Sequence, residues 1–159
     1  MKNNRFYNMG KFMAMESNYE DSDVVVFGVG FDGTTSNRPG TRFASGAMRS
    51  EFFGLETYSP LLELDMEDFN ICDRGDLELS IGNTDKVLDE IYEGTKEILN
   101  DDKFPFMIGG EHLVTLPAFK AVYEKYDDVY VLHFDAHTDL YEEYNNNKNS
   151  HATVIKRIW

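Results

Sequence analysis

Residues 129–140, VYVLHFDAHTDL, carry the pattern that decides the fold of this chain. The stretch begins as a short run of β-branched, aliphatic and aromatic side chains, which is typical of a strand buried in a sheet. It ends in D-A-H-T-D, which would not stabilise a buried strand. Side chains two residues apart on an extended chain point the same way, so Asp135, His137 and Asp139 can converge beyond the carboxyl end of the strand. Two carboxylates and an imidazole with a common focus predict a divalent metal site.

Apolar strands and amphipathic helices alternate along the rest of the chain. Residues 84–100 carry the clearest helix pattern, with apolar side chains along one face and Asn83 or Thr84 as the cap. This alternation predicts an α/β domain of three layers, in which a mainly parallel sheet is covered on both faces by helices. In such sheets ligands bind outside the carboxyl ends of the strands, where D-A-H-T-D is expected to lie. The other expected strands are 23–30, 69–72 and 105–108, and the other expected helices are 43–55, 116–126 and 151–159.

The remaining segments are expected to lack regular structure. Residues 73–76, DRGD, are typical of a turn, and residues 57–68 show no regular period. Residues 1–22 are polar with scattered aromatics, and we expect a leading arm that packs locally. Residues 23–159 are then assigned to a single α/β domain.

Composition and charge limit the partners and the location of the protein. The formal net charge of −14 argues against nucleic acid or an anionic membrane as a partner, because both require a basic surface. The single cysteine, Cys72, cannot form a disulfide within the chain, which fits a reducing compartment. The N-terminal residues lack the apolar core of a signal peptide, and no apolar run reaches membrane-spanning length. We therefore expect a cytoplasmic protein, to which a cationic small molecule would be attracted.

A second expected strand end adds to the metal-binding chemistry. In residues 109–112, G-G-E-H, the paired glycines allow close backbone approach, so His112 can project over the sheet edge. Glu111 is expected to point away and to have a supporting role. His133 shares the parity of Asp135 but sits deeper in the strand, so we expect a hydrogen-bonded core histidine. Oxygen and imidazole ligands without a thiolate favour manganese over zinc, iron or cobalt, and two carboxylates that can bridge indicate a pair of ions.

Two further motifs have simpler explanations. His151 is either an ordinary residue at a helix start or, beside a metal-bound hydroxide, a group that moves protons to a leaving amine. Residues 28–33 match G-x-G-x-x-G, but the third glycine leads into TTSNRPG rather than into a helix, and the next strand comes too late for a dinucleotide site. We interpret this motif as a glycine-rich turn and assign no cofactor-binding residue to it.

Five motifs occur together in this chain: GTTSNRPGTRFASGAMR (33–49), GDLEL (75–79), GGEH (109–112), HFDAHTDL (133–140) and SHATVI (150–155). In their order and spacing the chain resembles the ureohydrolase family of arginases and agmatinases, the agmatinases most closely. The resemblance implies the α/β/α arginase fold, two manganese ions, and hydrolysis of a guanidinium compound to urea and an amine by a metal-bridging hydroxide. It also implies four metal ligands, with Asp135 bridging the ions, and a role in proton transfer or substrate contact for His151. The implied ligands are His112, Asp135, His137 and Asp139.

The chain also departs from the pattern of this family. Gly30 stands where a proline is common and Leu113 where a serine is common, but neither change removes a ligand. Family members are considerably longer, and their second half carries a D-x-D-x-x-D-P motif that supplies two further aspartate ligands. Only eight residues follow His151, so we expect an amino-terminal, apparently truncated part of such a protein. Its affinity for two metals should be low, and an unpaired sheet edge would favour a homo-oligomer or instability.

The implied substrate is agmatine, which would give putrescine and urea. Agmatine ends in an amine cation where arginine carries a carboxylate, and a loop with Glu142 and Glu143 suits a cation. Guanidinobutyrate, formiminoglutamate or arginine is the alternative, because the same metal core serves all of them. Two alternatives belong to other classes. One is a non-catalytic fragment with a vestigial metal-binding edge, and the other is a flavodoxin-like nucleotide binder in which His112 and His137 have no role.

Overall fold

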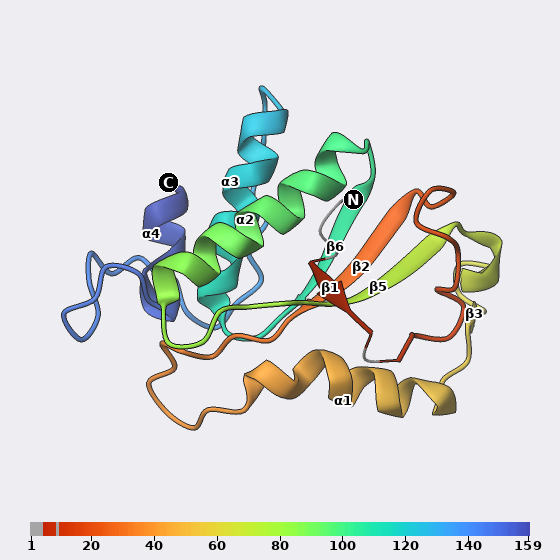
Figure 1. The fold of residues 1–159 in the computed structure, drawn as a ribbon, viewed down its shortest axis with the longest axis horizontal. Helices are drawn as coiled ribbons and strands as arrows, with labels where there is room; N and C mark the ends of the chain where they lie inside the picture. The colour runs from red at the N-terminus through yellow and green to blue at the C-terminus, as the bar shows by residue number, and fades with distance from the viewer. Residues whose placement is uncertain (1–4, 9) are drawn as a thin grey trace.

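The computed structural model describes residues 5–8 and 10–159 and contains a four-stranded sheet (Figure 1). Its strands are β1 (Phe6–Tyr7), β2 (Val24–Val29), β5 (Ile71–Leu77) and β6 (Phe104–Gly109). They lie in the order β1-β5-β2-β6, in which β2 is parallel to both β5 and β6, and β1 is antiparallel to β5. The prediction of a mainly parallel sheet is therefore confirmed.

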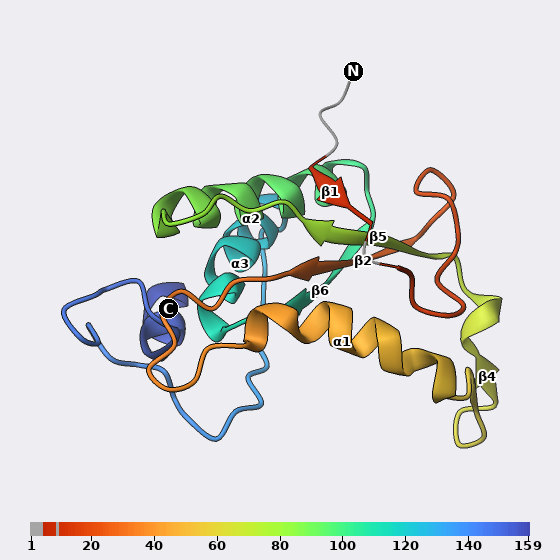
Figure 2. The ribbon, with the colours of Figure 1, turned by 60° about the horizontal axis from the view of Figure 1, so that its bottom comes forward.

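Helices cover both faces of this sheet. Figure 2 shows α1 (Ala44–Glu51) below the strands, and α2 (Thr84–Asn100) and α3 (Thr115–Lys125) above them. The short α4 (Val154–Ile158) packs against α3. This arrangement confirms the three-layer α/β/α architecture predicted from the alternation of strands and helices.

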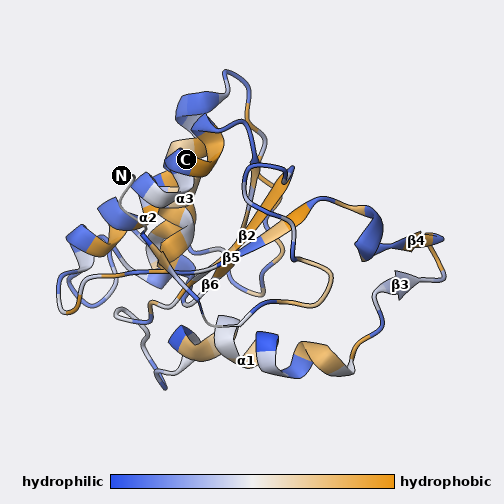
Figure 3. Cartoon of the chain, turned by 45° about the vertical axis from the view of Figure 1, so that its right-hand side comes forward, coloured by the Kyte–Doolittle hydropathy of each residue, from blue (hydrophilic) through white to orange (hydrophobic). Residues whose placement is uncertain are grey.

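The core lies between β2 and α2, and much of the hydrophobic colour at the centre of Figure 3 belongs to the strands. A strand that has a parallel neighbour on each side and a helix layer on each face is buried on both faces, which explains the unbroken apolar run of β2. Helix α2 contributes Val87, Ile91 and Ile98, each at most 1% exposed, from one face. The side chain of Asn83 accepts a hydrogen bond from the backbone N–H of Lys86, so the predicted cap is confirmed.

The prediction of a turn at residues 73–76 is wrong, because β5 runs through them. Gly75 has φ +85°, and a Cβ at this position would lie 2.1 Å from the backbone oxygen of Tyr7. The aspartates of this segment point inward, where Arg49 of α1 neutralises them. A charged sequence can therefore be a buried strand when a cation from a distant helix pairs with it.

The strand predicted at the start of residues 129–140 does not form. Residues 126–140 contain no helix or strand, and Tyr130, Leu132 and Phe134 are 86%, 84% and 93% exposed. In the described part of the chain, no strand pairs with the outer edge of β6. A strand needs backbone hydrogen bonds to a neighbour, and a strand with two apolar faces also needs a covering layer on each. The apolar pattern alone does not supply either.

Two segments expected to be irregular contain short strands. Residues 57–68 include a small antiparallel hairpin of β3 (Tyr58–Ser59) and β4 (Leu64–Asp65). Within the predicted leading arm, β1 joins the edge of the main sheet through β5. Among the described residues, no helix combines the length and the apolar character needed to cross a bilayer.

Candidate metal centre

His112 is held in place by the turn that follows β6. A Cβ at Gly110 would lie 1.9 Å from the backbone oxygen of Phe31, so only glycine fits this close approach. The backbone N–H of Glu111 donates to the same Phe31 oxygen at 2.8 Å. The turn therefore packs on the loop after β2, and His112 begins the short 3-10 helix that leads into α3.

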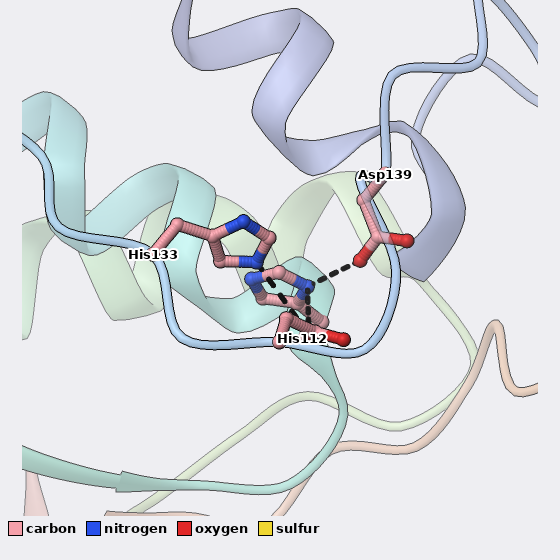
Figure 4. Close-up of side chains that lie close together, drawn as sticks. His112, His133 and Asp139 are labelled. Carbon is pink, nitrogen blue, oxygen red and sulfur yellow. Dashed lines mark hydrogen bonds and ion pairs between the residues drawn. The ribbon is translucent and has the colours of Figure 1, made fainter.

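Four side chains lie within reach of one cation next to this turn: His112, His133, Asp135 and Asp139. Figure 4 labels three of them, His112, His133 and Asp139. The Nδ1 atom of His112 is 2.6 Å from Oδ2 of Asp139 and 3.8 Å from Oδ2 of Asp135. The Nε2 atom of His133 is 3.5 Å from the same Asp135 oxygen, and its ring stacks on that of His112 at 5.3 Å. The ligand atoms of these four residues all lie within 4.8 Å of one another. His112, Asp135 and Asp139 therefore lie together as the sequence predicts, whereas His137, which was expected at the same focus, lies outside this group and His133 takes its place.

His137 lies on the other side of Asp135. Its Nδ1 atom is 3.3 Å from Oδ1 of Asp135, and its side chain is 81% exposed. The backbone N–H of His137 donates to Oδ1 at 2.8 Å and is the largest cause that lowers the pKa of Asp135. The two oxygens of Asp135 therefore face different histidines, His137 on one side and His112 with His133 on the other.

The prediction of a core position for His133 is wrong. The residue is exposed because residues 129–134 are not part of the sheet. Its ring contacts Asp135 and His112 instead of core side chains. In an extended strand the side chain of His133 would point the same way as that of Asp135, which is a signal for this contact. The contact was not predicted because more weight was given to the expected position of His133 inside a buried strand.

The donor set fits a hard or borderline divalent cation. It consists of imidazole nitrogens and carboxylate oxygens and contains no thiolate, which is the chemistry that suits manganese, iron or zinc. Carboxylates gathered this closely repel each other unless a positive charge lies between them. The residues of this chain therefore suit a metal ion by their chemistry and by their spacing.

The cluster opens into a cavity of about 740 Å³. The cavity is lined by the loop after β2, which includes Ser36 and Arg38, and by Tyr141 and Tyr144. His151 lines the same cavity, so both predicted parts of the site face one space. The ring of Tyr144 meets the His151 ring edge-on, with 5.4 Å between centroids.

His151 is held by polar contacts to the loop after β2. Its Nδ1 atom is 2.8 Å from the backbone oxygen of Thr34, and its Nε2 atom is 3.3 Å from Oγ of Ser36. Ser150 caps the short helix that begins at His151, through a capping box with Thr153. Sequence reasoning assigned no role to Thr34 or Ser36, although both belong to the motif 33–49 that carries the family resemblance.

Buried Asp32 gives this loop its shape. Its carboxylate accepts from the backbone N–H of Gly40 at 2.7 Å and from Nε of Arg42 at 2.6 Å. The hydrogen bond from Arg42 is the largest cause that lowers the pKa of Asp32, so the carboxylate stays ionised. The Asp32 side chain therefore joins the two ends of the loop after β2 and fixes the part of this loop that lines the cavity.

Comparisons with known proteins place the chain in a family. Residues 22–159 match the model of the arginase family. The agmatinase of Bacillus subtilis (strain 168) is 43% identical over 157 residues, which cover 99% of this chain and 54% of that protein. A Clostridium difficile protein provisionally named agmatinase has a crystal structure that is 76% identical, with a TM-score of 0.87 over 89% of this chain and 51% of that one. The agmatine ureohydrolase of Thermoplasma volcanium is 32% identical, with a TM-score of 0.85 over 96% of this chain and 50% of that one.

The chain spans about half the length of the curated relatives it matches. The match nevertheless covers nearly all of this chain, and it includes the four residues of the candidate metal centre, His112, His133, Asp135 and Asp139. The predicted family and the predicted arginase-like fold are both confirmed. The chain belongs to the arginase family.

Proposed function

We propose that the whole protein is a cytoplasmic, manganese-dependent hydrolase that converts agmatine to putrescine and urea. The observation that carries this proposal is the cluster of His112, Asp135 and Asp139 beside His151 in one cavity of an arginase-family chain. Relatives named agmatinase that match almost the whole chain support the choice of agmatine.

The proposed metal ligands divide into two groups around Asp135. His112, Asp139 and Oδ2 of Asp135 would hold one ion, and His137 with Oδ1 of Asp135 would hold part of the second. The placement of histidines on both sides of Asp135 supports a bridging role for this residue. When bound, a manganese pair supplies an activated water molecule and polarises the guanidinium carbon.

His151 is the proposed proton-transfer residue. The backbone oxygen of Thr34 accepts from Nδ1, so Nε2 is the atom left to exchange a proton in the cavity. An imidazole nitrogen can both accept and donate a proton, so the ring can give a proton to the leaving amine and regain one from solvent. The position of the ring in the cavity wall supports this role.

The structure gives little support to the expectation that Glu142 attracts the cationic tail of the substrate. Oε1 of Glu142 is 2.8 Å from Nζ of Lys156, and Oε2 is 3.3 Å from Nη2 of Arg157. These neighbours lower the pKa of Glu142 and neutralise its charge. The preference for agmatine over arginine is therefore supported by the named relatives rather than by this side chain.

Urea release tests the proposal directly. We expect the protein encoded by the complete reading frame, supplied with Mn²⁺, to release urea from agmatine at least about 10-fold faster, in kcat/KM, than from arginine or guanidinobutyrate. A colorimetric urea assay and chromatographic detection of putrescine measure both products. Urea from arginine alone would refute the substrate assignment, and no urea from any guanidinium compound would refute the proposed reaction.

We also propose that the 159-residue chain self-associates. Phe104 and Phe106 on the edge strand β6 are 64% and 52% exposed, and the aromatic residues of 130–134 are also exposed. Exposed edges with apolar side chains promote association between chains. Analytical ultracentrifugation should show a weight-average mass that rises with concentration, and Phe106→Lys should lower it. A monomer at every concentration would contradict this prediction.

A further inference from the structure

A buried carboxylate joins the segments that meet at the site. Glu111 is 5% exposed, and its Oε1 atom accepts from the backbone N–H of Thr34 at 2.7 Å and from the Thr34 hydroxyl at 2.6 Å. The backbone N–H of Glu111 also donates to Phe31. The turn after β6 is therefore fixed to the loop after β2 by backbone and side-chain hydrogen bonds together.

Thr34 in turn holds His151 at two points. Its Oγ1 atom accepts from the backbone N–H of His151 at 3.1 Å, and its backbone oxygen is 2.8 Å from Nδ1 of the ring. A carbonyl oxygen can only accept a hydrogen bond, so Nδ1 must carry the hydrogen. In the neutral ring this leaves Nε2 unprotonated, and Nε2 lies 3.3 Å from Ser36 on the cavity wall.

We propose that Glu111 and Thr34 are positioning residues that hold His151 in the Nδ1–H tautomer with Nε2 toward the cavity. This inference rests on the proposed proton-transfer role of His151. A threonine hydroxyl has one hydrogen to donate and lone pairs to accept with. The carboxylate of Glu111 takes that hydrogen, so the lone pairs of Oγ1 are left for the backbone N–H of His151. Because the backbone N–H and the hydroxyl of Thr34 both donate to Glu111, the position of the Glu111 carboxylate sets the direction of the hydrogen bond between Thr34 and His151.

The same network joins the two parts of the proposed site. Glu111 precedes His112 in the chain, so one turn positions both a proposed metal ligand and the anchor of the proton-transfer residue. The contacts join residues 77 and 117 positions apart in sequence. A disturbance at Thr34 should therefore reach His151 without removing any proposed ligand.

The tautomer of His151 can be measured without any activity assay. Long-range ¹H–¹⁵N spectra of the 159-residue chain, labelled at histidine, report which ring nitrogen is protonated, and loss of the signals in His151→Gln assigns them. We expect a protonated Nδ1 and a bare Nε2 in the parent chain. Thr34→Val keeps the volume but removes the hydroxyl, and should give a mixture of tautomers. Glu111→Gln should shift the signals in the same direction by less, because one acceptor oxygen remains.

Thr95→Val is the matched control. Thr95 is 1% exposed and donates its hydroxyl to the backbone of Ile91 within α2, away from His151. This variant should leave the His151 signals unchanged, and Thr34→Ser should restore the parent spectrum. The proposal is overturned if the parent chain shows Nε2–H, or if Thr34→Val and Glu111→Gln both keep the parent signals.

Activity of the complete protein gives a second readout. We expect Thr34→Val to lower kcat for urea release by about 10- to 100-fold with KM changed by less than about 2-fold, as for other residues that orient a functional group. An unchanged kcat would overturn the positioning role. A tautomer shift in a protein that releases no urea would leave the network intact and refute the proposed function alone, so the two failures are distinguishable.

Discussion

Replacing Arg49 with methionine is expected to lower the free energy of unfolding by about 3–5 kcal/mol. Arg49 is 2% exposed, and it donates to Asp73 from Nε and from Nη2, at 2.8 Å each, and to Asp76 from Nη1 at 2.5 Å. Methionine fills a similar volume but leaves two carboxylates buried without their cation. A loss of this size is a large share of the 5–15 kcal/mol that stabilises a typical domain.

The other hydrogen bonds of Asp73 and Asp76 explain why the loss of stability in Arg49→Met should be large. The carboxylate of Asp73 also accepts from the backbone N–H groups of Phe12 and Gly75, at 3.0 Å each. Asp76 accepts from the hydroxyl of Ser45 at 2.6 Å. These contacts hold the aspartates in place after Arg49 is removed, so they cannot turn to water without breaking β5.

Urea unfolding followed by circular dichroism measures the effect of Arg49→Met. Lys86→Met is the matched control, because Lys86 is 63% exposed and its pair with Glu90 is a surface pair worth less than about 0.5 kcal/mol. Adding Asp73→Asn and Asp76→Asn to Arg49→Met should recover part of the loss, since the unpaired charges are then gone. A loss below about 1 kcal/mol for Arg49→Met would contradict the prediction, because it would place the pair in the range of surface ion pairs.

The buried cluster of Arg49, Asp73 and Asp76 could not be predicted from the sequence. The strands and helices with a clear apolar period, such as β2 and α2, were predicted close to their observed bounds. The segment 73–76 was assigned to a turn because its charges argue against burial when it is considered alone. Its cation comes from residue 49, in a different element, and no local pattern reports such a pair. Buried charge is decided by tertiary contacts.

The candidate site, like the fold, could be predicted only in part. The proximity of His112 to Asp135 and Asp139 could be predicted, because in both segments ligand-type side chains follow an apolar run, although only His112 follows a strand in the fold. Thr34 could not be predicted, because its role depends on contacts to Glu111 and His151 across most of the chain. The assignment of residues 129–134 to a strand was wrong because pairing and coverage belong to the whole fold and not to the segment. The candidate ligand side chains lie close together even so, with His112 at the turn after β6.

Alanine substitutions at the proposed ligands should divide the metal site into its parts. In the complete protein we expect Asp135→Ala to weaken Mn²⁺ binding at both positions by more than about 100-fold, because loss of a direct ligand should exceed the 10- to 100-fold effects of residues that only orient ligands. His112→Ala should remove one ion and His137→Ala the other. The reason is that the two oxygens of Asp135 face His112 and His137 separately.

His133→Ala is the informative comparison. His133 lies 3.5 Å from Asp135 and stacks on His112, whereas His137 is 81% exposed at the rim of the cavity. If the family resemblance assigns the ligands correctly, His133→Ala keeps close to two ions per chain and changes affinity by less than about 10-fold, as expected for a residue that only supports a ligand. Calorimetric titration with Mn²⁺, checked by metal analysis after dialysis, gives the affinity and the stoichiometry. Loss of an ion in His133→Ala, with two ions retained in His137→Ala, would move the second histidine ligand from position 137 to position 133. Fewer than two ions in the unmodified complete protein would contradict the paired site itself, and with it the role of Asp135 as the bridge.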